Sequence, residues 1–273
     1  MSEQLQELVG LLELEQVEEN LFRAYHPAAR EGRLYGGQIM AQALMAASAT
    51  IGSPERLVHS LHGYFLRPGD PRMPAVIQVE RLRDGTSFSA RSVRVVQKGE
   101  VIFHMDASFQ VPQQGLEHQC DMPKSRPPEA HKIPDYLLEG PFLSWREDFR
   151  RLVSADPQPP QQLVWFKSNG PVPKDPATQA ALLVYESDNV LLGTSRLPHR
   201  GQYDPNHMQS ASLDHAIWFH HPVDVSQWLL YSLDAPTSQA GRGLNRGLIF
   251  NQQGQLIAST VQEGLIRTRP PAR

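Results

Sequence analysis

The sequence is poor in cysteine, since Cys120 is the single one among 273 residues. One cysteine excludes an intramolecular disulfide framework and a cysteine-rich zinc site, and it fits a reducing, cytoplasmic location. The histidines fall in two small groups, His59–His62 and His215–His221, without the His-x-x-x-His spacing of helical metal ligands. We therefore expect no metal site.

Long apolar runs and an excess of basic charge are also lacking. No stretch reaches the roughly 20 apolar residues that a membrane-spanning helix needs, so membrane insertion is not expected. The formal net charge of -3 argues against a nucleic-acid partner. The leading segment Met1–Phe22 carries six glutamates and no basic leader, and its leucines have near-helical spacing. It predicts a docked amphipathic helix, not a signal peptide.

Three motifs of enzyme sites are absent from the sequence. No Gly-x-Ser-x-Gly elbow occurs, which disfavours a serine hydrolase of that kind. No P-loop and no Gly-x-Gly-x-x-Gly fingerprint occurs, so neither a nucleotide fuel nor a dinucleotide cofactor is indicated. Hydrolysis without a cofactor fits what remains.

The segments that are present begin with one long helix. Tyr35–Ala47 is rich in good helix formers and is stopped by Gly52 and Pro54. Short turns with glycine separate the four strand-like runs that follow, which are Arg56–Leu66, Ala75–Arg83, Ser87–Gln97 and Val101–Gln110. A buried helix followed by an antiparallel meander is predicted.

A proline-rich segment interrupts this pattern. Residues 112–161 hold too many prolines for a long regular element, so we interpret them as a crossing linker. Within the linker, Tyr136–Leu152 contains Trp145 and Phe149 and predicts one surface helix.

After the linker the same order of elements recurs. A strand at Leu163–Lys167 precedes a helix at Pro176–Leu192, which has Asp175 as its N-cap. Further strands are predicted at Met208–His220, Gln227–Leu233, Gly243–Phe250 and Gln255–Ile266. The run His62–Pro68 echoes His215–Pro222, and Ser89–Arg91 echoes Ala240–Arg242. These echoes indicate a duplicated unit.

Two helix-plus-meander units predict an α+β fold. A helix that is apolar on most faces needs a sheet wrapped around it, and this arrangement is the hotdog fold. Two units joined edge to edge into one continuous sheet would protect their edge strands. We predict a double hotdog with an N-terminal unit at 1–111, the linker at 112–161, and a C-terminal unit at 162–273 that carries the catalytic set.

Asp188 is the first candidate for chemistry. It lies near the end of the second helix, where its neighbours one turn away are bulky and mostly apolar. A carboxylate on such a face is costly to bury unless it is hydrogen-bonded, and burial of this kind is common for a general base. The alternative, equally weighted from helix context alone, is an aspartate that caps or ends the helix.

Ser212 and Gln262 are polar residues inside strand-like apolar sequence. A serine and a glutamine can hold a water through complementary donors and acceptors while a carboxylate takes its proton. Taken singly, each is more often an ordinary outward-facing strand residue. Val58 or His59 and Ala107 or Ser108 stand at the matching first-half positions, so one active site per chain is predicted.

Gly36, Gly37 and Gln38 begin the first helix. Paired glycines at a helix start leave backbone N–H groups open to a ligand, which suits an oxyanion. The alternative is that the glycines only allow a tight entry turn.

These residues resemble the acyl-CoA thioesterase II family over nearly the whole chain. The resemblance rests on seven runs: Tyr35–Gln38, Val58–Asp70, Leu82–Arg91, Ser187–Asp188, Ser212–His220, Trp228–Tyr231 and Ala258–Gly264. It implies a double-hotdog acyl-CoA hydrolase whose Asp, Thr or Ser, and Gln fall on Asp188, Ser212 and Gln262 and activate a water.

The resemblance also implies a substrate and an assembly. We expect fatty acyl-CoA as substrate, no cofactor, and a homo-oligomer that is a dimer or a tetramer. The anionic CoA end needs cationic contacts, for which Arg67, Arg91, Arg94, Arg242 and Arg246 are candidates. Gly36, Gly37 and Gln38 are candidate substrate contacts as well.

Two alternatives to a thioesterase stay open. A hotdog enoyl-thioester hydratase would normally use a histidine paired with an acid at the helix start, which Gly36-Gly37-Gln38 does not offer. A non-catalytic acyl-CoA-binding protein would bind acyl-CoA without releasing CoA, and the polar set around Asp188 argues against it.

Overall fold

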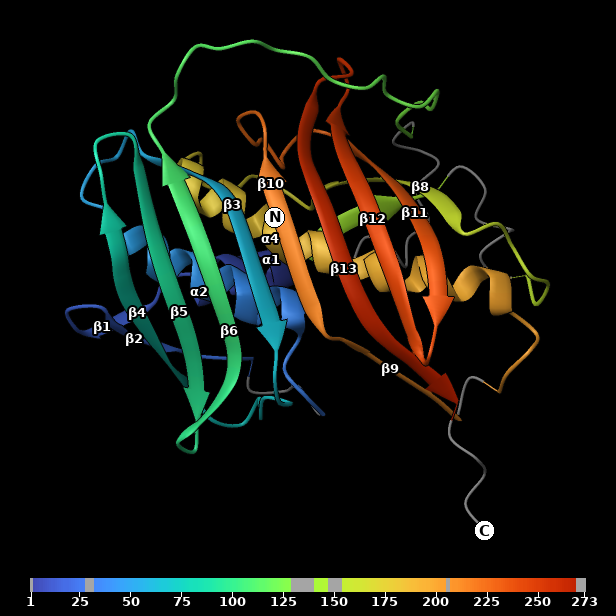
Figure 1. Cartoon of the computed structure of the whole chain (residues 1–273), viewed down its shortest axis with the longest axis horizontal. Coiled ribbons are helices and arrows are strands. Elements are labelled where there is room, and N and C mark those ends of the chain that lie inside the picture. Colours follow the sequence, from blue (N-terminus) through green and yellow to red (C-terminus); the bar gives the residue numbers. More distant parts are fainter. Residues whose placement is uncertain (1, 28–31, 129–139, 147–153, 205–206, 269–273) are drawn as a thin grey trace.

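One antiparallel sheet organises the chain. The computed structural model describes residues 2–27, 32–128, 140–146, 154–204 and 207–268, and within them thirteen strands form a single sheet (Figure 1). The strands of the first half are β1 (Glu15–Glu18), β2 (Leu21–Ala24), β3 (Leu57–Phe65), β4 (Ala75–Asp84), β5 (Phe88–Gln97) and β6 (Glu100–Gln110). Those of the second half are β7 (Phe142–Trp145), β8 (Gln161–Ser168), β9 (Met208–Ser212), β10 (Asp214–Phe219), β11 (Leu229–Gln239), β12 (Arg242–Asn251) and β13 (Leu256–Thr268).

The strand order is symmetric about the middle of the sheet. The strands run β1-β2-β4-β5-β6-β3 and then β10-β13-β12-β11-β8-β7, while β9 pairs with β13 off this path. β3 and β10 join the halves, with Leu61 opposite Ile217. Each half places two strands before its long helix and the remaining strands after it. The predicted α+β double hotdog is confirmed by this order.

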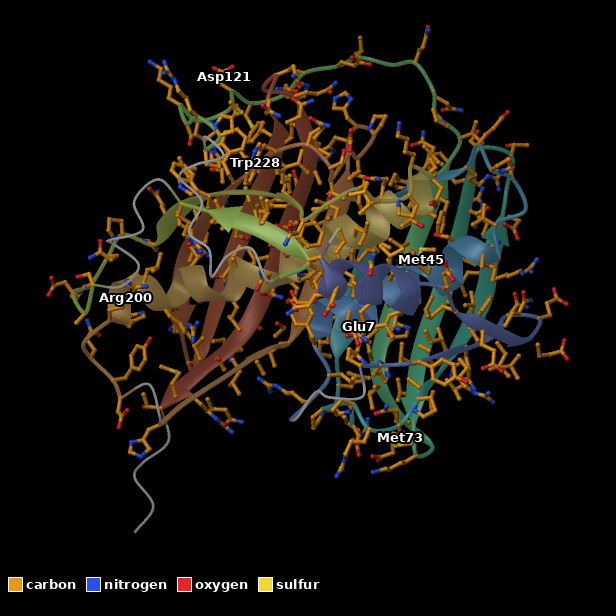
Figure 2. All side chains as sticks on the ribbon, turned by 180° about the vertical axis from the view of Figure 1, so that it is seen from behind. Glu7, Met45, Met73, Asp121, Arg200 and Trp228 are labelled. Atoms are coloured by element: carbon orange, nitrogen blue, oxygen red, sulfur yellow. The ribbon has the colours of Figure 1, made fainter. Side chains whose placement is uncertain are left out.

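Two long helices lie on one face of the sheet. α2 (Gly36–Ala49) and α4 (Pro176–Leu191) run behind the strands in Figure 1, and Figure 2 shows them from their own side. Ten of the 14 residues of α2 are buried, so this helix belongs to the core of the protein. At the start of α4 the side chain of Asp175 accepts a hydrogen bond from Thr178 N, as its N-cap role predicts.

The N-terminal segment divides into a helix and two strands. α1 (Glu3–Leu11) buries Leu5 and Leu8, and Figure 2 shows Glu7 on its outer side. The predicted helix therefore ends early, and β1 and β2 follow it. β2 pairs with β4, which extends the sheet and covers what would otherwise be an open edge. Among the described residues, no helix is both long and apolar enough to cross a bilayer.

Two further segments differ from the sequence prediction. Part of the helix predicted at Tyr136–Leu152 is the strand β7, in which Trp145 pairs with Trp165 of β8. The flanking parts of that prediction, 136–139 and 147–152, lie outside the described residues. The strand predicted at Met208–His220 is two strands, β9 and β10, with a break at Leu213. At this break Glu263 N of β13 donates to the Asp214 side chain and not to a backbone carbonyl, so the ladder with β13 is interrupted.

The segment after β6 crosses between the halves. In Figure 1 its described part passes over the end of the sheet from β6 toward the strands of the second half. Gln119 bonds Gly254 O and Leu256 N there, and Ser125 accepts from the indole of Trp165. The linker prediction agrees with this path, while the boundaries of 1–111, 112–161 and 162–273 stay predictions.

The internal sequence echoes do not align structurally equivalent residues. His62 is exposed whereas His215 is fully buried, so the two lie on opposite faces of the sheet. Arg91 is buried whereas Arg242 is exposed. The duplication is visible in the strand order, and the residue-by-residue pairing drawn from these echoes is wrong.

Candidate active site

Asp188 lies where the C-terminal part of α4 meets the start of α2. Its side chain is 8 % exposed, and Gly37 N donates to its Oδ2 at 2.9 Å. Tyr35, the N-cap residue of α2, offers no side-chain cap of its own, so Asp188 supplies one from the other half of the chain. The positive end of the α2 dipole also faces this carboxylate, which offsets part of the cost of burying it.

Ser212 and Gln262 complete a cluster around Asp188 Oδ1. Ser212 Oγ donates to this oxygen at 3.1 Å, and Gln262 Nε2 donates to it at 2.5 Å. Gln262 Nε2 also lies 3.1 Å from Ser212 Oγ. The structure thus brings together the three side chains that the sequence singled out, from α4, β9 and β13.

The strand register explains why Gln262 points inward. Thr260, Gln262 and Gly264 alternate on the buried face of β13, and Gln262 is fully buried. Ser212 lies opposite Gly264 in the β9–β13 pairing, so it sits diagonally across from Gln262 on the same face. The interpretation of Gln262 as an ordinary outward-facing strand residue is wrong.

Gly36 and Gly37 are needed for close packing of α2 on α4. Both have helical backbone conformation, so neither serves a special turn. A Cβ on Gly37 would stand 2.4 Å from the carbonyl oxygen of Tyr185, and one on Gly36 would stand 2.9 Å from Asp188 Oδ2. The tight-turn interpretation is therefore wrong. The Gly37 N–H is already donated to Asp188, so the structure does not leave it open to an oxyanion.

Two of the predicted substrate contacts are corrected by the structure. Arg91 is 1 % exposed, and its guanidinium donates to the Asp84 carboxylate and to the hydroxyl and carbonyl oxygens of Thr50, the C-cap residue of α2. That end of the helix is opposite to the one at Asp188, so Arg91 cannot bind substrate there. The Gln38 side chain is also buried and contacts His26 Nδ1 at 3.1 Å. Both side chains stabilise the fold of the first half.

A cavity of about 1110 Å³ opens beside Asp188 and Ser212. Gly36 and Ile39 of α2 and Phe65 of β3 form part of its apolar wall. Five arginines line it as well: Arg33, Arg67, Arg146, Arg196 and Arg200. Figure 2 shows Arg200 beyond the C-terminal end of α4. Asp188 is the one acidic residue among the described residues of this lining, so the cavity is strongly cationic in a protein of net charge -3.

His215 is a site residue that sequence reasoning missed. It is fully buried, its Nδ1 lies 3.2 Å from Gln262 Nε2, and burial lowers its pKa to about 4. His215 lies two residues before the apolar Ile217, so the period of two in a strand places both on the inner face of β10. This spacing is the sequence signal that could have identified His215 as buried. Within the described residues, no group of three or more histidines, cysteines and acids is placed to hold a metal ion.

At the opposite end of the helix pair, the described residues form no matching cluster of carboxylate, hydroxyl and amide. There Asp175 caps its own helix α4, and Ala49 of α2 lines a smaller cavity of about 400 Å³ together with Asp175 and Thr178. The symmetric fold therefore carries an asymmetric pair of sites. One active site per chain stays a prediction.

Glu186 is a second buried carboxyl on α4. Its Oε1 accepts from Ser144 Oγ at 3.3 Å and from Asn189 Nδ2 at 3.2 Å. Burial raises its pKa from 4.5 to about 7, against the opposing effect of these hydrogen bonds and of the Arg146 charge. The folded protein thus favours the neutral form of Glu186 near neutral pH.

A pH-dependent stability follows from Glu186. Because its folded-state pKa lies above its unfolded value, its contribution to stability is lost as pH rises from about 4.5 to about 7. Glu186→Gln keeps the shape of the side chain and its acceptor oxygen but cannot ionise. We expect the free energy of unfolding of this variant to exceed that of the wild-type protein only slightly near pH 4, and by roughly 2–3 kcal/mol near pH 8. Urea unfolding at both pH values measures this, and a difference that does not change with pH contradicts it.

Comparison with known proteins agrees with this geometry. A family model described as "Acyl-CoA thioesterase" matches residues 143–265, and one described as "Acyl-CoA thioesterase N-terminal domain" matches residues 25–110. The chain is 39% identical to "Acyl-CoA thioesterase 2" of Haemophilus influenzae, over 98% of this chain and 99% of the relative. It is 38% identical to human "Acyl-coenzyme A thioesterase 8", over 95% and 88% of the two chains.

Solved structures show the same relationship. The crystal structure of the acyl-CoA thioesterase II TesB2 from Mycobacterium marinum superposes with a TM-score of 0.83 at 41% identity, over 98% of this chain and 99% of that one. A dehydratase domain from Pseudomonas fluorescens reaches a TM-score of 0.54 at 12% identity, which shows a shared fold alone. From its full-length similarity to these thioesterases, the chain belongs to the acyl-CoA thioesterase family.

Proposed function

We propose that this protein hydrolyses fatty acyl-CoA to a free fatty acid and CoA, with Asp188, Ser212 and Gln262 activating the attacking water. One observation carries the proposal: a buried carboxylate and a hydroxyl line a cavity that is rich in arginines, and the buried amide of Gln262 donates to that carboxylate. The carboxylate suits a general base, and the arginines suit the phosphates of CoA.

The hydrogen-bond inventory of the site leaves room for a water. An ionised carboxylate offers about four lone-pair directions, and Asp188 receives three donors, from Gly37, Ser212 and Gln262. One direction is left to accept a proton from water. Gln262 Oε1 is buried without a hydrogen-bond partner among the described residues, so it is a second acceptor that a water can use.

The reaction balances without a cofactor. The water oxygen bonds to the thioester carbon while one of its protons passes to Asp188, and the C–S bond then breaks. The CoA thiolate takes up this proton from Asp188 as it leaves, which restores the carboxylate, and the acyl group departs as a carboxylic acid. General-base assistance of this kind contributes about 10²–10⁴ in rate.

The arginine-lined part of the cavity fits the anionic end of the substrate. Arg67, predicted as a substrate contact, lies on this lining but also donates to Val101 O and approaches Glu100. Arg196 lies on the same lining and, within the described residues, forms no ion pair. We therefore assign Arg196 the larger share of the phosphate contacts.

Arg196→Ala should weaken binding of acyl-CoA with little effect on chemistry. A hydrogen bond to a charged group contributes about 1.5 kcal/mol, so we expect KM to rise roughly 10-fold at nearly constant kcat. An acyl-pantetheine thioester lacks the nucleotide phosphates and should show no such change. Arg94→Ala is the matched control, because Arg94 is an exposed arginine outside this cavity. An equal loss for both substrates would remove the phosphate role.

One assay separates the proposal from its alternatives. Incubation with saturated acyl-CoAs of several chain lengths, with release of free thiol as the readout, should show multiple turnovers. Saturable binding without thiol release would instead indicate a binding protein. Hydration of an enoyl-CoA without thiol release would indicate a hydratase.

Location and assembly are proposed from the composition and from the family resemblance. A cytoplasmic location is supported by the cysteine content, since Cys120 is the single cysteine and no intramolecular disulfide can form. A homo-oligomer, either a dimer or a tetramer, is expected from the family resemblance. Light scattering of the purified protein measures the assembly directly.

A further inference from the structure

Two buried side chains behind Gln262 have no part in the water activation proposed above. His215 and Ser187 are both fully buried. His215 Nδ1 lies 3.2 Å from Gln262 Nε2, and His215 Nε2 lies 3.0 Å from Ser187 Oγ. A buried line of hydrogen bonds therefore runs from α4 through β10 to β13.

The direction of these hydrogen bonds follows from the Ser187 end. Ser187 Oγ–H donates to the carbonyl oxygen of Val184 at 2.9 Å, so it offers only lone pairs to the imidazole. His215 Nε2 must then carry the ring proton. Burial lowers the pKa of His215 to about 4, which keeps the ring neutral and leaves Nδ1 as an acceptor. Gln262 can satisfy that acceptor only with its amide NH₂ group.

Asp188 imposes the same requirement on Gln262. Gln262 Nε2 contacts Asp188 Oδ1 at 2.5 Å, and the reversed amide would place its carbonyl oxygen against this carboxylate. Two acceptors, one carboxylate and one imidazole, thus take the two N–H bonds of the amide. The carbonyl oxygen of Gln262 is left as an acceptor, buried and without a partner among the described residues.

We infer that His215 and Ser187 are positioning residues that hold the Gln262 amide in one orientation, with its NH₂ on Asp188 and the imidazole and its carbonyl oxygen available to the attacking water. The inference rests on the proposed function, because it assigns Gln262 a role toward that water. Ser187 and Asp188 are adjacent on α4, and Tyr231 Oη donates to the Ser187 carbonyl at 3.0 Å. One anchored turn of α4 therefore fixes both the base and the start of the line.

The first test measures the His215 tautomer and needs no catalysis. Nitrogen-15 spectra of histidine-labelled protein, with the His215 signals assigned from the His215→Asn variant, report which ring nitrogen carries the proton. We expect a neutral ring protonated at Nε2 throughout the neutral pH range. A ring protonated at Nδ1, or at both nitrogens, would overturn the inference.

The second test follows turnover. Removing the imidazole acceptor with His215→Leu should lower kcat about 10- to 100-fold, as expected for a displaced catalytic group, with KM changed little. His215→Asn should recover most of this loss, because its Oδ1 can accept in place of Nδ1. His59→Leu is the matched control, since His59 also pairs with a serine, Ser108, at 2.8 Å but lies outside the cavity lining.

A double variant decides whether His215 acts through Gln262. In the Gln262→Ala background, His215→Leu should change kcat less than about twofold, because the group that it positions is gone. Additive losses would overturn the positioning role. If Gln262→Ala lowers kcat but His215→Leu does not, the positioning role alone is wrong. If Gln262→Ala leaves kcat unchanged, the proposed function fails at Gln262 and the positioning role fails with it.

Discussion

Asp188→Asn should lower kcat for acyl-CoA hydrolysis by about 10²–10⁴, the range that a general base contributes. Asparagine has nearly the same shape but cannot take a proton from water. Its NH₂ group would also face at least one of the donors that now serve the carboxylate, namely Gly37 N or Gln262 Nε2. Steady-state release of free thiol measures the loss, and KM should change far less than kcat.

The control for this variant lies at the other end of the same helix. Asp175→Asn should keep normal turnover, because asparagine caps a helix start about as well as aspartate does. Circular dichroism and thermal unfolding of both variants show whether the fold is kept. Near-normal hydrolysis by folded Asp188→Asn would exclude Asp188 as the base.

Gly37→Ala should cost both stability and turnover. Its Cβ would stand 2.4 Å from the Tyr185 carbonyl oxygen, which is backbone and cannot rotate away. The start of α2 must therefore move off α4, at a cost of about 1–3 kcal/mol for an overpacked core. The same movement breaks the hydrogen bond from Gly37 N to Asp188 Oδ2, so we expect kcat to fall about 100-fold.

Gly10→Ala is the matched control for the Gly37 variant. Gly10 lies in α1, and a Cβ added there would meet no heavy atom within 4 Å. Alanine is the better helix former, so this control should stabilise the protein by about 0.5–1 kcal/mol and leave turnover unchanged. Thermal unfolding and thiol release on both variants give the comparison. Equal stability of the two would show that the helix contact is looser than described.

The periodic segments of the sequence predict the fold because their pattern reports burial directly. The helix at Pro176 has a local start signal in Asp175, and the strands between Ala75 and Gln110 have alternating side chains between glycine turns. Strands β1 and β7 carry no such pattern, since each has only four residues. Every residue of β1 is exposed, and β7 pairs with β8 inside a segment whose prolines indicate a linker. The residue pairing drawn from the internal echoes is wrong because similar sequences in the two halves do not place their residues on the same face of the sheet.

The candidate site also contains residues that local sequence can identify and residues that it cannot. Asp188 stands out locally, because it is a carboxylate among apolar neighbours on a helix. The contacts of Gly37 and His215 depend on how two distant segments meet, so a single stretch of sequence cannot reveal them. Arg91 shows the reverse case, in which an arginine suited to a phosphate is instead buried against Thr50 and Asp84.

In the proposed mechanism Asp188 activates a water molecule that attacks the thioester, and Asp188 is not itself the nucleophile. Single-turnover hydrolysis with enzyme in excess over acyl-CoA in ¹⁸O-labelled water tests it most directly. Mass spectrometry of the products should find the label in the fatty acid and none in the peptide that contains Asp188. Label incorporated into the Asp188 carboxylate would contradict the account.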